Sequence, residues 1–78
     1  MELSNAIRKR IINLCEEKNM HANQLAIMSG INPSTIRSII KSRCKTPTVQ
    51  TIYYLCIGFG ISLKDFYDSK LFENLEDN

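Results

Sequence analysis

The chain has 78 residues, of which 44% are hydrophobic and 23% are charged, and its net charge is +2. This length predicts a single globular domain and leaves no room for a separate catalytic or ligand-sensing domain. No apolar run approaches the roughly 18 residues of a membrane span, and the first residues lack the pattern of a signal peptide. We therefore expect a cytoplasmic protein without a membrane partner.

The charge is divided unevenly along the chain. Residues 1–50 hold eight Lys or Arg against three acids, a sum of +5, whereas residues 51–78 hold two against five, a sum of −3. No acid lies between Glu17 and Asp65. This division predicts one basic face for an anionic partner and an acidic end turned away from it, although a solvated surface of mixed charge is the alternative.

The sequence contains no catalytic or metal-binding constellation. Cys15, Cys44 and Cys56 are odd in number and widely spaced, which argues against disulfides and zinc and favours free thiols. Cys44 lies between two basic residues that could lower its pKa, so a redox role is the alternative there. His21 is the only histidine, and no glycine-rich phosphate loop is present. We expect no enzyme activity, metal or cofactor, and no small-molecule ligand is evident.

Apolar residues recur at helical spacing throughout, and no segment alternates as a half-buried strand does, so we predict an all-α fold. A first helix is expected over about Ser4–Lys18 and a second over Ala22–Ser29. Gly30 ends the second helix because glycine adopts positive φ without a Cβ penalty. The residues predicted to face inward from these two helices are Ile7, Ile11, Leu14, Leu25 and Ala26.

A third helix is predicted over residues 33–42 and leads into a basic loop. The Asn32 side chain can cap its first turn, and Pro33 suits the first helical position, where its missing N–H has no partner to lose. The residues predicted to face inward are Ile36, Ile39 and Ile40, and those predicted to face outward are Ser34, Thr35, Arg37, Ser38 and Lys41.

Two shorter signals complete the domain. Thr48 can cap a fourth helix, which we expect Gly58 and Gly60 to end. Ser62, with Asp65 three residues later, has the form of a capping box and opens a fifth helix. The predicted core face of the fourth helix is Ile52, Leu55, Cys56 and Phe59, and the fifth helix carries Leu63, Phe66 and Tyr67.

Residues 70–78 form an acidic tail after the expected domain of residues 1–69. The tail holds Leu71, Phe72 and Leu75 among its acids. Three fates are open from the sequence: the tail extends the fifth helix, docks elsewhere on the domain or frays.

The second and third helices with their glycine turn resemble the helix-turn-helix of the phage repressor and Cro family, also called the XRE family. The resemblance implies a five-helix lambda-repressor-like domain with the helix-turn-helix at helices 2 and 3. It extends over about Ile7 to Tyr67. The residues that carry it are Gln24-Leu25-Ala26-x-x-x-Gly30-Ile31-Asn32-x-Ser34-Thr35-Ile36, Pro47-Thr48, Thr51-Ile52, Leu55-Cys56 and Gly60-Ile61-Ser62-Leu63-x-x-Phe66.

The resemblance also implies how DNA is bound. The third helix would place its first residues in the major groove while the second crosses the phosphate backbone. Arg37 is the best candidate for reading a base, because guanidinium can grip guanine O6 and N7 together; a phosphate contact is the alternative. The implied base-facing residues are Ser34, Arg37 and Ser38, and the implied phosphate contacts are Asn23, Asn32, Thr35, Lys41, Arg43 and Lys45.

The chain departs from the family pattern in three places. Where relatives often have Ser-Gln at the start of the second helix it has His21 and Ala22, and where they often have Gln it has Pro33. Both changes remove familiar DNA contacts. Many relatives also pair an Arg of the first helix with a Glu of the third, and Cys15 and Ile40 occupy the matching positions. We predict that these two residues touch in a shielded spot.

The resemblance predicts a sequence-specific DNA-binding regulator, a repressor that occupies an inverted-repeat operator as a homodimer. The alternative is an antitoxin or another protein-interaction module with the same fold. Exposed apolar residues on the fourth helix, in the following turn and in the tail are the candidates for the dimer surface. They are Tyr53, Ile57, Ile61, Phe72 and Leu75.

Overall fold

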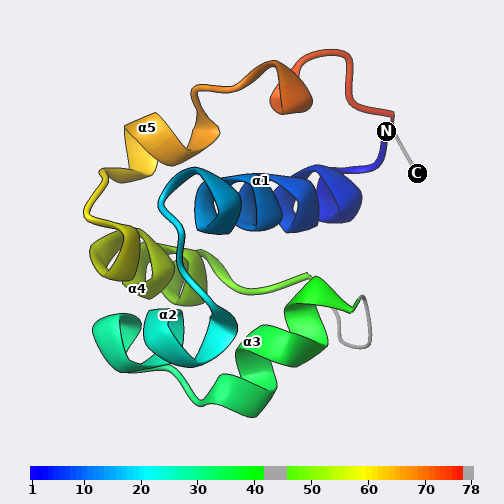
Figure 1. Cartoon of the computed structure of the whole chain (residues 1–78). Helices are drawn as coiled ribbons and strands as arrows, with labels where there is room; N and C mark the ends of the chain where they lie inside the picture. Colours follow the sequence, from blue (N-terminus) through cyan, green and yellow to red (C-terminus); the bar gives the residue numbers. More distant parts are fainter. Residues whose placement is uncertain (42–45, 77–78) are drawn as a thin grey trace.

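The computed structural model describes residues 1–41 and 46–76, and these contain helices and no strand. The all-α, five-helix prediction is confirmed. In Figure 1, α1 crosses the middle of the molecule, with α2, α3 and α4 on one side and α5 and the tail on the other. The elements are α1 (Leu3–Glu17), α2 (Ala22–Ser29), α3 (Pro33–Ile40), α4 (Val49–Phe59), α5 (Leu63–Tyr67) and a short 3-10 turn, η1 (Lys70–Phe72).

The hydrophobic core is built from residues of all five helices. Every residue predicted to face inward from α1, α2 and α4 is buried, as are Ile36 and Ile39 of α3. Phe66 of α5 is fully buried and closes the core from the side of the tail. Ile40 is the exception to the predicted stripe. It is only half-buried, because it is the last residue of α3 and lies beside an open cavity.

The predicted helix caps are confirmed. Asn32 Oδ1 accepts a hydrogen bond from the Ser34 N–H at 2.9 Å, Thr48 Oγ1 accepts from Thr51 at 3.1 Å, and Ser62 Oγ accepts from Asp65 at 3.0 Å. Each bond supplies a partner to a backbone donor that the first turn of a helix leaves unpaired. The helix starts of α3, α4 and α5 are therefore encoded locally.

The end of α3 differs from the prediction. The helix stops at Ile40 instead of residue 42, and Lys41 takes the cap position with φ −87° and ψ 5°. Lys41 is exposed, so continuing the helix through it would add no apolar burial to stabilise the last turn.

Gly58 corrects a second expectation. It does not end α4 but lies buried inside it, and Gly60, with φ +74°, is the residue that ends the helix. A Cβ atom on Gly58 would lie 2.9 Å from the Ser29 Cβ and 3.1 Å from the Ser29 backbone nitrogen. The glycine is therefore needed for the close approach of α2 to α4.

The tail docks on the domain. The Phe72 ring packs edge-on against Tyr67, with ring centroids 5.0 Å apart, and it lies against the buried core. The Glu76 N–H donates to the Met1 carbonyl at 3.1 Å, and the Met1 ammonium group pairs with the Glu76 carboxylate at 3.1 Å. Of the three fates that the sequence left open, docking is the one observed.

Candidate nucleic-acid interface

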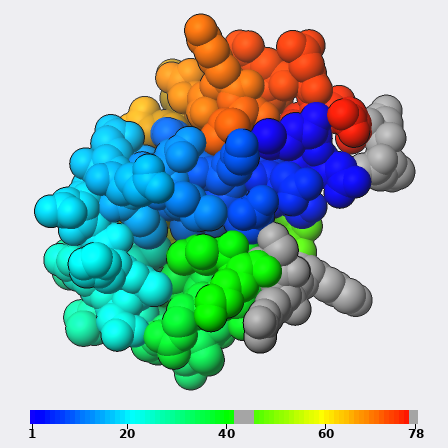
Figure 2. Space-filling view, turned by 45° about the vertical axis from the view of Figure 1, so that its right-hand side comes forward, coloured from blue at the N-terminus to red at the C-terminus, as the bar shows by residue number. Residues whose placement is uncertain are grey.

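The α2–α3 unit has the geometry of two helices joined by a tight turn. Gly30 at the end of α2 has φ +74°, a left-handed conformation that turns the chain before Asn32 caps α3. Ser29 packs against Gly58 of α4, which fixes α2 against the body of the domain. Figure 2 shows α2 and α3 side by side on the lower face, beneath α1. The unit presents the outer face of α3 to solvent.

The outer face of α3 carries the side chains predicted to contact DNA. Ser34, Thr35, Arg37 and Lys41 are exposed, whereas Ser38 is half-buried. Ile36 and Ile39 hold the opposite face in the core. Because this helix is apolar on one side and small, polar and cationic on the other, it can lie against a nucleic acid without losing its packing.

Arg37 and Asn23 connect the two helices of the unit. Arg37 Nη1 donates a hydrogen bond to Asn23 Oδ1 at 3.0 Å, and both side chains are exposed. The predicted base-reading residue of α3 is thus held by a predicted phosphate contact of α2. Guanidinium has five N–H donors in a planar fork, so this bond leaves donors for a base edge or a phosphate.

The cap of α3 limits what two predicted contacts can do. Asn32 Oδ1 accepts from both the Ser34 backbone N–H and the Ser34 hydroxyl, the latter at 2.8 Å. The Asn32 oxygen is therefore engaged, and its amide NH2 group is the donor left for a phosphate. The Ser34 hydroxyl proton is directed to the cap, so in this arrangement the Ser34 oxygen is left as an acceptor.

Two predicted contacts cannot be placed, and one further cation has a different role. The predicted phosphate contacts Arg43 and Lys45, like Cys44, lie outside the described residues. Arg10 has an internal role that sequence reasoning missed. Its Nε donates to the Phe66 carbonyl and its Nη2 to the Asp65 carbonyl, each at 2.7 Å. Arg10 therefore anchors α5 to α1, and no local sequence pattern signals a contact across 55 residues.

The dimer candidates lie in two different settings. Tyr53 and Ile57 are 49% and 51% exposed, and Val49, which sequence reasoning missed, lies one turn before them and is 68% exposed. These three residues, at i, i+4 and i+8, form one exposed apolar stripe on α4, and that spacing was already visible in the sequence. Leu75 is also exposed, whereas Ile61 and Phe72 are half-buried against the core of their own chain.

The described residues offer no group of three or more His, Cys, Asp or Glu that could hold a metal ion. Cys15 and Cys56 are free thiols, and burial raises the pKa of both, so each is protonated at neutral pH. In the same part of the chain, no helix is long and apolar enough to cross a membrane.

These features define a class of protein. In this helical domain a glycine turn leads into a capped helix, which lies beside the preceding helix and has a small, cationic outer face. This arrangement is that of a helix-turn-helix DNA-binding domain. Residues 10–70 match the Cro/C1-type helix-turn-helix DNA-binding domain family, and the chain belongs to it. It is a DNA-binding regulator of transcription, a class that is generally not enzymatic. The resemblance drawn from the sequence is confirmed.

Solved structures agree with the family assignment. The chain is similar to the crystal structure of the prophage Lp1 protein 11, with 29% identity, a TM-score of 0.79 and coverage of 96% of this chain and 100% of that one. It shares the fold of the restriction-modification controller protein C.Esp1396I, with 20% identity, a TM-score of 0.84 and coverage of 100% and 99%. A search of curated proteins finds no match.

Proposed function

We propose that this protein is a cytoplasmic transcriptional repressor that binds double-stranded DNA sequence-specifically, with α3 in the major groove. The observation that carries the proposal is the outer face of α3, where exposed Arg37 is joined to Asn23 at 3.0 Å. A side chain held in place before binding loses less conformational entropy when it meets a base edge. Repression follows when the bound protein occupies the operator.

The proposed contacts divide by chemistry. Arg37 reads a guanine through O6 and N7, and Ser34 and Ser38 face neighbouring base edges. The others contact phosphates and set the position of the protein on the duplex without reading sequence. These phosphate contacts are Asn23, Asn32, Thr35, Lys41, Arg43 and Lys45.

We propose further that two protomers bind one inverted-repeat operator. A domain with one short recognition helix makes few base contacts, and two-fold pairing doubles them at half-sites about 34 Å apart. The α4 stripe of Val49, Tyr53 and Ile57 supports the dimer surface, because it is apolar and exposed. Leu75 is exposed but lies in the tail next to Glu76, which bonds to Met1, whereas Ile61 and Phe72 contribute only their exposed edges.

Selection of bound duplexes from random DNA tests the proposal. The expected result is an enriched motif with two-fold symmetry, in which a guanine recurs in each half-site. Sedimentation of the complex on the selected duplex should then give two protomers per site. Enrichment of no motif would contradict sequence-specific binding, and one protomer on an asymmetric site would contradict the dimer.

A further inference from the structure

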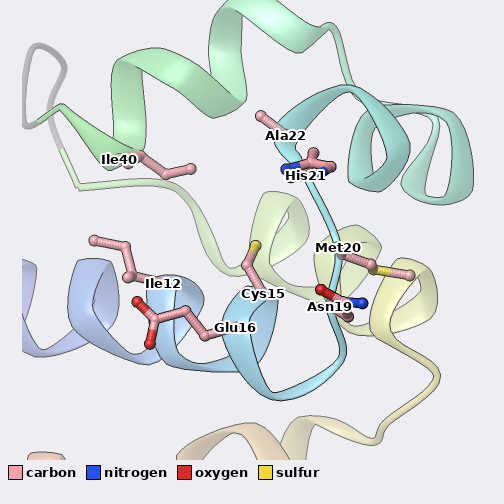
Figure 3. Close-up of a pocket in the computed structure, with 8 residues that line it drawn as sticks. All are labelled: Ile12, Cys15, Glu16, Asn19, Met20, His21, Ala22 and Ile40. Carbon is pink, nitrogen blue, oxygen red and sulfur yellow. The ribbon is translucent and has the colours of Figure 1, made fainter.

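A cavity of about 330 Å³ opens between α1 and the helix-turn-helix. Figure 3 shows the Cys15 sulfur directed from α1 into this space, with Ile40 and Ala22 on the opposite wall. Three elements and one turn form the lining, so the cavity belongs to the tertiary fold and not to one helix. The lining residues are Ile12, Cys15, Glu16, Asn19, Met20, His21, Ala22 and Ile40.

The cavity suits the apolar part of a small molecule. Ile12, Cys15, Met20 and Ile40 are half-buried around it, so their side chains present hydrocarbon and sulfur to the space. Protein interiors normally leave few voids larger than a water molecule, and ligand sites begin at about 300 Å³. Filling this space would remove apolar surface from water on both the protein and its occupant.

Glu16 is the acidic side chain at the exposed edge of the cavity. Among the described residues that line it, Glu16 is the one carboxylate, and none is a lysine or arginine. The ion pair found in the described part of the chain joins Met1 to Glu76 and does not involve Glu16. Burial raises the pKa of the Cys15 thiol, and the negative charge of Glu16 raises it further. The exposed Glu16 carboxylate and the half-buried Cys15 thiol therefore lie on the same wall of the cavity.

We propose that this cavity binds a small primary amine carried on an apolar body. The body lies against Ile12, Cys15 and Ile40, and the ammonium group donates to the Glu16 carboxylate. An anion of the same shape is disfavoured because Glu16 repels it. The occupant touches Ala22 at the start of α2 and Ile40 at the end of α3, so it bridges α1 to both helices of the DNA-binding unit.

A titration of the full chain with three probes tests the proposal. 2-Phenylethylamine supplies the amine, 2-phenylethanol is its neutral counterpart, and phenylacetate is the anion. Backbone amide shifts in NMR spectra should map 2-phenylethylamine to residues around Cys15, Met20 and Ile40, with a Kd on the order of 1 mM for so small a molecule. The alcohol should bind about 3-fold more weakly, because the ion pair is partly exposed to solvent, and phenylacetate more weakly still.

Three variants separate the charge from the cavity. Glu16→Gln should lower amine binding to the level of the alcohol and leave alcohol binding unchanged, whereas Glu17→Gln, beside it on α1 but outside the lining, should change neither. Cys15→Leu should fill the space and weaken both probes. Equal binding of amine and alcohol to the unaltered chain, or shifts that map elsewhere, would overturn the proposal. Both of these outcomes are measured on the unaltered chain, so they remain decisive even if Cys15→Leu fails to fold.

Discussion

Arg37 of α3 donates a hydrogen bond to Asn23 of α2 at 3.0 Å, so the two helices of the DNA-binding unit are joined at the face that we assign to DNA. The bond spans the Gly30 turn and involves side chains that are both exposed. A hydrogen bond to an exposed, neutral acceptor such as the Asn23 amide oxygen adds little to the free energy of unfolding. We infer that its value lies in the orientation of the guanidinium group before DNA arrives.

Because α2 and α4 approach closely at Gly58, adding one methyl group there should have a large effect on the stability of the fold. Gly58→Ala should lower the free energy of unfolding by about 1–3 kcal/mol, because the new Cβ meets the Ser29 backbone as well as its side chain. This loss should appear even though alanine favours a helix over glycine by about 1 kcal/mol. Urea denaturation measures the loss. Adding Ser29→Gly to Gly58→Ala removes the closest contact and should restore part of the lost stability. If the losses of the two single variants simply add in the double variant, the two sites do not clash.

The anchoring of α5 by Arg10 predicts a second stability effect. Arg10→Met keeps the apolar stem but removes two charged donors from the Phe66 and Asp65 carbonyls, which should cost about 2 kcal/mol in urea denaturation. Arg10→Lys should recover only part, since an ammonium lacks the planar fork. Lys9→Met, at the exposed neighbouring position, should stay within about 0.5 kcal/mol. Equal losses at positions 9 and 10 would refute the anchoring role.

Burial of Cys56 predicts that stability falls in alkali. The pKa of this thiol is raised above its ordinary value of 9.0, chiefly by burial, although Arg10 opposes the rise. The folded state therefore keeps a proton that the unfolded chain loses as the pH rises past about 9, and the free energy of unfolding declines. Cys56→Ala should make this decline shallower in reduced samples unfolded by urea at several pH values. An unchanged slope would show that Cys56 does not contribute.

The α4 stripe predicts the effect of charge on assembly. Ile57→Lys should shift the protein to monomer in sedimentation and weaken binding to a two-fold operator. The unfolding free energy should stay within about 0.5 kcal/mol, because Ile57 is exposed in the free chain. Leu3→Lys is the matched control, an exposed apolar residue at the start of α1. If both variants assemble like the unaltered chain, the dimer uses another surface.

The helices were predictable because their signals are local. Asn32, Thr48 and Ser62 cap the helices they were expected to cap, and apolar spacing identified the buried faces. Gly58 misled the prediction because a helix-ending glycine and a close-packed glycine look alike in sequence. Only the position of Ser29 on a different helix distinguishes them.

The candidate site was predictable in part. The exposed face of α3 follows from helical spacing, but the Arg37–Asn23 bond depends on the angle between two helices, which no local pattern gives. The predicted shielding of Cys15 and Ile40 from solvent needs correction. Both residues line one open cavity and both are only half-buried, so Ile40→Glu should cost less than a buried, unpaired carboxylate would.

The measurement that tests the central claim most directly is the affinity of Arg37→Ala for operator and random duplexes across a salt series. We predict that operator binding weakens by about 1–3 kcal/mol while the preference at one base pair relaxes. Lys41→Ala is the matched control: it should weaken both duplexes alike and reduce the slope of log affinity against log salt by about 1. If Arg37→Ala weakens operator and random DNA equally, α3 does not read sequence through Arg37, and the account is contradicted.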